Sequence, residues 1–280
     1  MNSQLLILGL HRVGYPPPEA KIRGLFISPD LLSFQLSIIQ KMGFRFTSLR
    51  DALDNPYGKR AVITFDDGYQ DNIENALPIL QKFNAPATLF VITGDVGKRK
   101  VVWKEAGENL PADLLDWNSL RSLVNLGWEI GSHAHAHVHL ARYSEFEQRV
   151  HISKSIAEIR KNLGIKPVSF AYPYGSFNEI TKKSLHEQGI KYAVTTLPTN
   201  QKNSFFIEDL LELSRVSLGG RMMHHYAKTC FKMAKAVSIC DLLNGFINLS
   251  LSSGFIPLRR KSLLSNAFRM PLDKVPDSRS

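Results

Sequence analysis

The stretch ITFDDGYQDN, residues 63–72, joins a strand-like run to two adjacent carboxylates. The apolar run 61–65 is typical of a buried strand, and Asp66 and Asp67 follow it directly. Desolvation and mutual repulsion both work against two like charges at the end of such a strand. Groups elsewhere in the chain must therefore make the arrangement favourable, and they should also indicate its chemistry.

Strand-like and helix-like patterns alternate on both sides of this stretch. The strand-like runs are 5–10, 61–65, 87–93, 128–132, 168–174, 192–196 and 211–218. Helices are predicted over 29–43, 71–83, 118–127, 145–164 and 179–189. This alternation predicts an α/β fold with a mainly parallel sheet and helices outside it. Either an open doubly wound sheet or a closed barrel fits the pattern.

The composition is that of an ordinary globular chain, with 280 residues of which 44% are hydrophobic and 21% charged. The formal net charge of +10 suggests an anionic neighbour: a membrane surface, a nucleic acid or an acidic glycan. No nucleic-acid-binding motif accompanies the charge, so we expect no nucleic-acid partner. Cys230 and Cys240 form no CxxC pair, and we expect them to be reduced thiols.

The two ends of the chain bear on its organisation. The short apolar run 5–10 lacks a basic leader, so we expect a first strand rather than a signal peptide. No apolar run reaches the roughly 18 residues that span a bilayer, which favours a cytoplasmic protein. Residues 219–280 look helical and basic, and we expect a C-terminal extension to a domain of residues 1–218. The extension either packs on that domain or rests on an anionic membrane.

Polar side chains follow the predicted strands where their carboxyl ends would form a site. His11 follows the first strand, and SHAHAHVH, with His133 and His137, follows strand 128–132. On a helical turn the i, i+4 spacing would place these two imidazoles on one face, where they could share a metal ion. Two histidines and one carboxylate are a common ligand set for a catalytic divalent ion.

This ligand set could explain why two carboxylates stand side by side at the end of a strand. One aspartate would bind the cation, and the other would act as a general base beside activated water. Each signal has a plainer explanation, because DD before glycine often forms a solvated turn and His-rich loops bind metals adventitiously. We expect His135 and His139 to be loop or supporting residues rather than ligands. The placement of all these groups after barrel-type strands favours the functional interpretation.

Three motifs, TFDDGY, GSHAHAHVHL and FAYPYG, resemble those of the polysaccharide deacetylases, the NodB-homology or carbohydrate esterase family 4 proteins. The likeness covers about residues 5–218 and points to the subset of the family that reads FAYPYG, although Ala134 stands where the family usually has Ser or Thr. It implies a distorted (β/α)7-type barrel, which chooses between the two architectures. It also implies hydrolysis of an N-acetyl amide on an amino sugar with one divalent metal, commonly zinc.

The resemblance also implies roles for particular residues. Asp66 would be the base, and Asp67, His133 and His137 would be the metal ligands. Tyr174 would contribute its backbone N–H to an oxyanion pocket. These roles suit amide hydrolysis, because a metal and an N–H group are preorganised donors for the developing oxyanion.

Two departures from the family pattern lead to further hypotheses. Ala171 stands where the family usually has an Arg that orients the base, and Arg215 could supply that guanidinium from another strand. The plainer alternative for Arg215 is a surface side chain. The family's late Leu-x-His motif, which carries the catalytic acid, has no counterpart after residue 218. His11 in LGLHRV would fill that role if the barrel is circularly permuted; otherwise it is a buried strand-end histidine.

The substrate is indicated less directly. Trp103 and Trp117 flank the long connection 94–116 and could stack on sugars, or they could be ordinary core aromatics. Tyr69 and Pro173, beside the motif residues, are the other candidates for substrate contact. Three functions stay open: a sugar N-deacetylase, a hydrolase of another acyl amide such as an N-formyl sugar, and a non-catalytic glycan-binding protein. The intact motif carboxylates and histidines count against the third.

Overall fold

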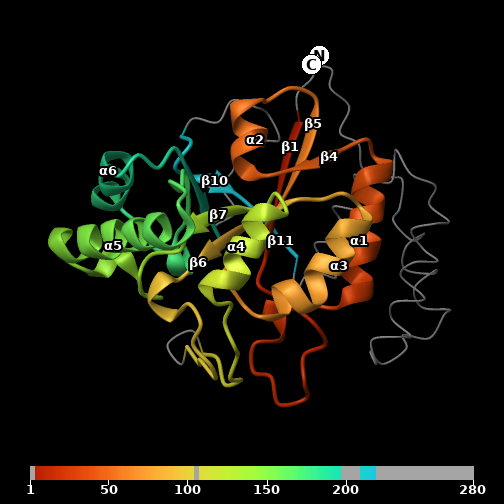
Figure 1. The fold of residues 1–280 in the computed structure, drawn as a ribbon, viewed down its shortest axis with the longest axis horizontal. Coiled ribbons are helices and arrows are strands. Elements are labelled where there is room, and N and C mark those ends of the chain that lie inside the picture. Colours follow the sequence, from red (N-terminus) through yellow and green to blue (C-terminus); the bar gives the residue numbers. More distant parts are fainter. Residues whose placement is uncertain (1–3, 104–106, 197–208, 219–280) are drawn as a thin grey trace, which may run out of the picture. The chain divides into compact units, whose positions relative to one another are not determined.

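Nine of the described strands form one parallel sheet that curls into a nearly closed barrel with helices around it (Figure 1), and the other two, Arg12–Val13 and Phe26–Ile27, form a small separate sheet. A computed structural model describes residues 4–103, 107–196 and 209–218. The predicted extension 219–280, both cysteines and the membrane contact expected of that segment lie outside the described residues. No helix in the described ranges has the length and apolar character needed to cross a membrane.

The bounds of the elements agree with most of the predicted ranges. The strands are β1 (Gln4–Leu10), β2 (Arg12–Val13), β3 (Phe26–Ile27), β4 (Arg45–Thr47), β5 (Lys59–Phe65), β6 (Ala87–Val91), β7 (Glu129–Ser132), β8 (Ser169–Ala171), β9 (Tyr192–Thr195), β10 (Leu213–Ser214) and β11 (Val216–Ser217). The α-helices are α1 (Pro29–Lys41), α2 (Leu49–Asp54), α3 (Leu77–Lys82), α4 (Trp117–Asn125), α5 (Glu145–Leu163) and α6 (Glu179–Glu187). Five short helices complete the described ranges: Arg23–Leu25, the π-helix Asn72–Ala76, Thr93–Asp95, Leu140–Arg142 and Pro173–Gly175.

The barrel closes through one bent segment. The strand order is β10-β9-β8-β7-β6-β5-β1-β11, and β4 pairs with the first half of β5. The two ends of this path, β10 and β11, are consecutive in the chain and are separated only by Arg215. If the bent segment counts as one strand, seven strands surround the barrel, as the (β/α)7 prediction requires. The predicted single strand 211–218 is therefore broken at Arg215.

Alternation along the strands separates an inner from an outer core. Ile7, Val62 and Phe90 face the interior, where α2 adds Leu49 and Ala52. Their neighbours in the strands, including Leu8, Ile63 and Leu89, face outward and pack with residues of α1, α3 and α4. Successive side chains of a strand point to opposite faces, so a strand with both faces buried needs apolar residues on each of them. Sequence analysis missed β4 and α2 because both are very short.

Helix ends follow the local sequence. Ser28 caps α1 through the Leu31 N–H, with Pro29 at the first helical position. Ser144 and Glu147 form a capping box at the start of α5, which ends at Gly164 in the left-handed conformation. The predicted helix 71–83 differs, because its first turn is a π-helix, Asn72–Ala76, before α3 begins. π-Turns of this kind occur frequently at functional sites.

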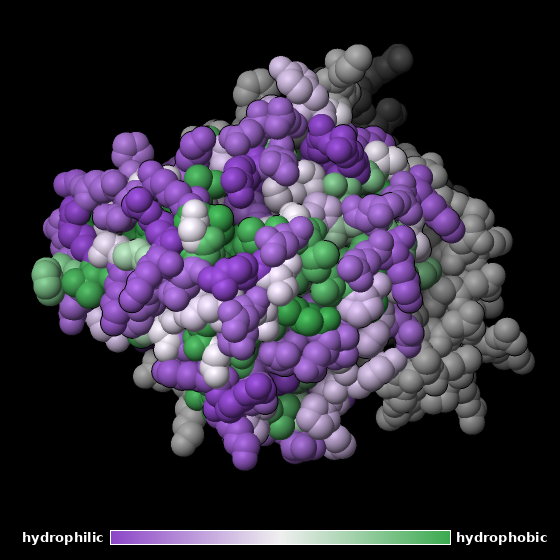
Figure 2. Space-filling view, viewed as in Figure 1, coloured by the Kyte–Doolittle hydropathy of each residue, from purple (hydrophilic) through white to green (hydrophobic). Residues whose placement is uncertain are grey.

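The helices turn their polar faces to solvent. Figure 2 shows mainly hydrophilic side chains over the face seen in Figure 1, with hydrophobic side chains only in small areas. A helix exposed on one side and packed on the other needs this distribution. The apolar side chains of α1, α3 and α4 are accordingly turned towards the sheet.

We predict that Gly131→Ala destabilises the barrel. A Cβ at Gly131 would lie 2.5 Å from Phe90 Cδ1 and 2.6 Å from Ser169 Oγ, and the buried Phe90 ring has little room to move. Overpacking of this kind costs about 1–3 kcal/mol of unfolding free energy, measurable by denaturant titration. Gly24→Ala is the matched control, because nothing lies within 4 Å of its added Cβ. Equal unfolding midpoints for the two variants would contradict the packing argument.

Candidate functional site

The carboxyl ends of neighbouring strands deliver the predicted polar residues to one end of the barrel. Asp66 and Asp67 follow β5, and His11 follows β1, which pairs with β5 along its whole length. His133 follows β7 and Tyr174 follows β8. The strand order therefore brings together residues that are far apart in sequence.

Asp67, His133 and His137 form a group that could hold a metal ion. Their ligand atoms all lie within 4.8 Å of one another. Asp67 Oδ1 is 3.4 Å from His133 Nε2 and 3.6 Å from His137 Nε2. This oxygen is buried and has no hydrogen-bond partner among the described residues. A carboxylate oxygen and two imidazole nitrogens that converge on one point fit a divalent cation such as zinc.

The histidine rings are oriented as ligands. His133 Nδ1 donates a hydrogen bond to the Ala171 carbonyl oxygen at 2.7 Å, which directs Nε2 towards Asp67. Burial lowers the pKa of His137 to about 4, against the opposing charge of Asp67, and keeps that ring neutral. Burial also acts to lower the pKa of His133, but the Asp67 carboxylate, 3.4 Å from its Nε2, and the charge of Asp66 outweigh it. A cation at this site therefore competes with a proton on His133.

A loop, and not a helical turn, brings the two histidines together, so that part of the prediction was wrong. Residues 133–139 lie between β7 and the short helix Leu140–Arg142 without helical hydrogen bonds. Ala134 has a φ of 62° and is fully buried. The His133 N–H donates to the Val91 carbonyl oxygen at 2.9 Å. A left-handed residue inside the loop gives a geometry that spacing alone does not predict.

Asp66 has a different partner from Asp67. Arg215 Nη1 and Nη2 donate to the two carboxylate oxygens of Asp66, each at 2.7 Å. Arg215 Nη1 also donates to Thr64 Oγ1 at 3.0 Å. Burial acts to raise the pKa of Asp66, but the Arg215 guanidinium outweighs it and the pKa is lowered. The two adjacent carboxylates are thus stabilised separately, one by two imidazoles and one by a guanidinium.

The break between β10 and β11 places Arg215 at this position. Its side chain is only 3% exposed and contacts Asp66, so Arg215 is not a surface side chain, while its role in orienting a base stays a prediction. A Cβ at Gly9 would lie 3.4 Å from Arg215 Nε, which shows how closely the arginine packs against β1.

His11 lies at the open side of the carboxylates. Its Nε2 is 3.8 Å from Asp66 Oδ2, and its side chain is 30% exposed. A backbone hydrogen bond also ties Asp66 to the residue before His11, because the Asp66 N–H donates to the Leu10 carbonyl oxygen at 3.0 Å. The imidazole is thus near the reacting groups and reachable from solvent, as a proton donor must be.

Tyr174 lies beside His137, one of the candidate metal ligands. Its φ of 56° is left-handed, a conformation that costs a non-glycine residue of the order of 1 kcal/mol and is frequent at functional sites. Its ring centroid is 4.2 Å from that of His137 and 4.1 Å from that of His139. Pro173, just before it, is buried. Sequence analysis missed the stacking of His139 on Tyr174, because the contact depends on the loop conformation.

Trp103, in the 94–116 connection, and Tyr69 form an aromatic wall beside His137. The Trp103 ring lies 5.0 Å from the His137 ring, and its Nε1 donates to Asp95 Oδ2 at 3.2 Å. Tyr69 packs edge-on against Trp103 and is only 1% exposed, so it supports the wall from behind. Trp117 begins α4 and packs against the main hydrophobic core instead. Of the two tryptophans, Trp103 is therefore the one at the site.

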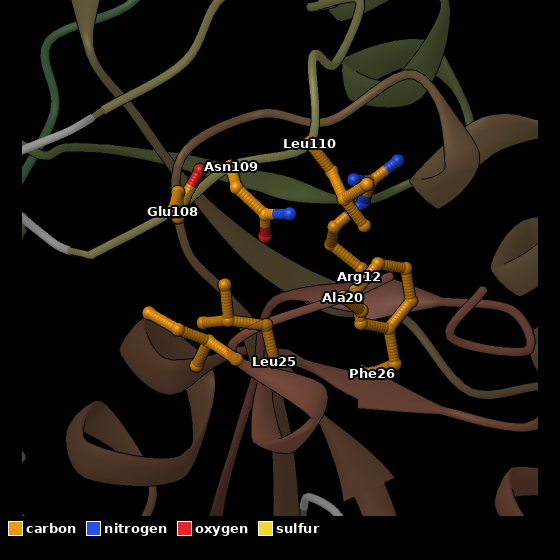
Figure 3. A pocket seen from close by; sticks show the side chains of 8 residues that line it. Arg12, Ala20, Leu25, Phe26, Glu108, Asn109 and Leu110 are labelled. Carbon is orange, nitrogen blue, oxygen red and sulfur yellow. The ribbon is translucent and has the colours of Figure 1, made fainter. Parts of the chain in front are cut away.

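Glu108 is a residue that sequence analysis did not identify. The Tyr69 hydroxyl donates to its Oε1 at 3.3 Å. Burial, followed by the charge of Asp67, raises the pKa of Glu108 to about 7. It borders a small hollow lined by Arg12, Ala20, Ile22, Leu25, Phe26, Glu108, Asn109 and Leu110 (Figure 3). A volume of about 10 Å³ holds roughly one water molecule, so this hollow is not a sugar site.

Comparisons with known proteins agree with this geometry. A family model described as polysaccharide deacetylase matches residues 54–193. A poly-beta-1,6-N-acetyl-D-glucosamine N-deacetylase of Staphylococcus aureus (strain MRSA252) is 28% identical over 208 residues, or 68% of this chain and 69% of that protein.

Two solved structures share the fold. The Streptococcus pyogenes deacetylase PplD in complex with acetate has a TM-score of 0.67 at 27% identity, covering 82% of this chain and 98% of that one. IcaB from Ammonifex degensii has a TM-score of 0.66 at 24% identity, covering 81% and 97%. At that identity the second likeness speaks only for the fold.

We predict that Arg215→Ala destabilises the protein at neutral pH. The variant leaves the Asp66 carboxylate buried without its cation, which costs about 3–5 kcal/mol of unfolding free energy. Because the pair lowers the pKa of Asp66, its contribution is present above the unfolded value of about 3.9 and is lost as the pH falls through the folded value. Denaturant titration at neutral and acidic pH should therefore show a difference that shrinks in acid.

Arg149→Ala is the matched control for this measurement. Arg149 pairs with Glu145 and Glu187 on the surface of α5, where screening leaves ion pairs little effect on stability. If Arg215→Ala were as stable as Arg149→Ala at neutral pH, the buried Asp66–Arg215 pair would not contribute the predicted free energy of unfolding.

Proposed function

Because the chain belongs to the polysaccharide deacetylase family, we propose that it removes the acetyl group from N-acetylated amino-sugar units of a polysaccharide and releases acetate. The observation that carries the proposal is the division of labour between the two carboxylates. Asp67 converges with two histidines, whereas Asp66 is held apart by Arg215. Hydrolysis of an amide needs both a Lewis-acid site and a separate base, and this arrangement offers both.

Asp67, His133 and His137 would hold one divalent cation, and their mixed oxygen and nitrogen donors favour zinc. When bound, such a cation supplies Lewis acidity, which polarises the amide carbonyl and makes water more acidic. The remaining chemistry belongs to the chain itself.

Asp66 is the base in this proposal. Its lowered pKa keeps the carboxylate ionised at neutral pH, and Arg215 fixes both of its oxygens. A carboxylate oxygen of Asp66 accepts a proton from the attacking water while the water oxygen bonds to the acyl carbon. The Tyr174 backbone N–H is proposed to donate to the oxyanion that develops on the carbonyl oxygen.

His11 is the acid in this proposal. When the carbon–nitrogen bond breaks, the leaving amine needs a proton, and protonated His11 supplies it from Nε2. The 3.8 Å between His11 Nε2 and Asp66 Oδ2 supports the assignment, because acid and base must flank the same amide. The products are acetate and a free amine on the sugar.

The relatives suggest a first substrate to test. The Staphylococcus aureus relative is named for a β-1,6-linked N-acetyl-D-glucosamine polymer, and the Streptococcus pyogenes structure holds acetate. We propose N-acetylglucosamine units as the substrate class, with the Trp103 side chain as one wall of the cleft for the sugar.

We predict that the zinc-loaded protein releases acetate from a β-1,6-linked N-acetylglucosamine oligosaccharide. Asp66→Asn should lower kcat by about 10²–10⁴-fold, because the amide cannot accept the proton. Asp51→Asn is the control, since Asp51 is an exposed carboxylate on α2 and should leave turnover unchanged. Acetate and formate are measured in the same assay.

Three results would count against the proposal. Full acetate release by Asp66→Asn would remove Asp66 as the base. Release of formate only, from an N-formyl sugar, would change the acyl group. A zinc-loaded wild type that releases neither acid from any N-acyl sugar would overturn the function.

A further inference from the structure

The last residues of the ITFDDGYQDN stretch have no part in the chemistry proposed above. Asp71 and Asn72 lie at the start of the π-helix Asn72–Ala76. Both side chains reach back to the chain segment that follows β1 and carries His11. Their position next to a candidate acid calls for a physical explanation.

Four hydrogen bonds join the π-helix to this segment. Asn72 Nδ2 donates to the His11 carbonyl oxygen at 2.8 Å, and Asn75 Nδ2 donates to the Val13 carbonyl oxygen at 2.7 Å. The Val13 N–H and Arg12 Nε donate to the two carboxylate oxygens of Asp71, at 2.9 and 3.0 Å. We call these four bonds the clasp.

His11 depends on the clasp because no strand ladder holds its backbone. The strand β1 ends at Leu10, and the next strand, β2, starts at Arg12 and pairs with β3 in a separate small sheet. The Leu10 carbonyl accepts the Asp66 N–H, and the His11 carbonyl accepts the Asn72 side chain. Both bonds come from residues 66–72, the segment that also supplies the candidate base.

The environment of Asn72 makes it a rigid support. Its side chain is fully buried, and its Nδ2 donates to both the His11 carbonyl oxygen and Asp71 Oδ1. The π-helix places Asn75 on the same side, because both asparagines reach the segment 11–13. An error of about 1 Å in the position of a catalytic group can cost 10²-fold in rate, so such a support matters for turnover.

We propose that Asn72 and Asn75 are positioning residues that set the place of the His11 imidazole relative to Asp66. They act through the backbone of residues 11–13 and touch neither substrate nor metal. The inference rests on the proposed function, in which His11 is the acid. It explains why the stretch that carries the proposed base, Asp66, also ends in Asp71 and Asn72. The same segment then holds both the base and the backbone of the proposed acid.

The test is a double-mutant cycle with His11→Gln. Asn72→Ala should lower kcat by about tenfold or more and Asn75→Ala by a few-fold, with KM changed by less than about twofold. In the His11→Gln background the same substitutions should change kcat by less than about twofold, because the residue they position is no longer an acid. A purely structural role would lower kcat equally in both backgrounds.

Asn109→Ala is the matched control. Asn109 also bridges the chain after β1, through the Glu19 carbonyl at 2.8 Å and the Lys21 N–H at 2.9 Å, but away from His11. It should leave kcat unchanged. If Asn72→Ala does not fold, Asn75→Ala decides, because Asn75 is exposed and its truncation leaves no cavity.

A crystal structure of the asparagine variant gives a second measurement that does not depend on activity. The His11 ring should move from Asp66 by about 1 Å or more while the Asp66–Arg215 pair stays in place. An unmoved ring, or equal losses of kcat in both backgrounds, would overturn the inference. A wild type without any deacetylase activity would overturn the proposed function instead, and the ring position would still decide the clasp.

Discussion

The buried ion pair between Asp66 and Arg215 links the closure of the barrel to the chemistry at its mouth. Arg215 stands where β10 ends and β11 begins, so the residue that breaks the last strand also holds Asp66 by two hydrogen bonds of 2.7 Å. Burying two charges is costly unless the geometry is good and the remaining donors are satisfied. The bidentate contact, with Thr64 as a further acceptor, meets that condition. Closure of the barrel and orientation of the carboxylate therefore depend on the same side chain.

This pair leaves Asp67 for a different task. Two adjacent aspartates that shared one cation would compete for it, whereas here each faces its own partners. Asp67 has a φ of 74°, which is left-handed rather than extended, and this backbone turns its side chain away from that of Asp66. The proposed roles of one metal ligand and one base require this division. The chain belongs to the polysaccharide deacetylase family, and the strands β1, β5, β7 and β8 bring these side chains together.

The sequence was sufficient for features that depend on local pattern. The β–α alternation predicted the parallel sheet, and the strand ends predicted the grouping of His133 and His137 with an aspartate, because parallel strands end on the same side of a sheet. The choice of a barrel, and of Asp67 as the ligand, came from the resemblance of the motifs to a known family. It was not sufficient where distant contacts decide. The left-handed Ala134 replaces the expected helical turn, and the strand breaks at Arg215, which pairs with Asp66. The roles of His139, Glu108 and Asn72 depend on loops whose partners lie far away in sequence.

The most direct test of the account is an anomalous diffraction measurement on crystals of the protein soaked with zinc. The account predicts one strong peak at about 2.0–2.2 Å from Asp67 Oδ1, His133 Nε2 and His137 Nε2, with Asp66 still bound to Arg215. Zinc coordinated by Asp66, or no peak among these three residues, would contradict the division of the two carboxylates on which the proposed chemistry depends.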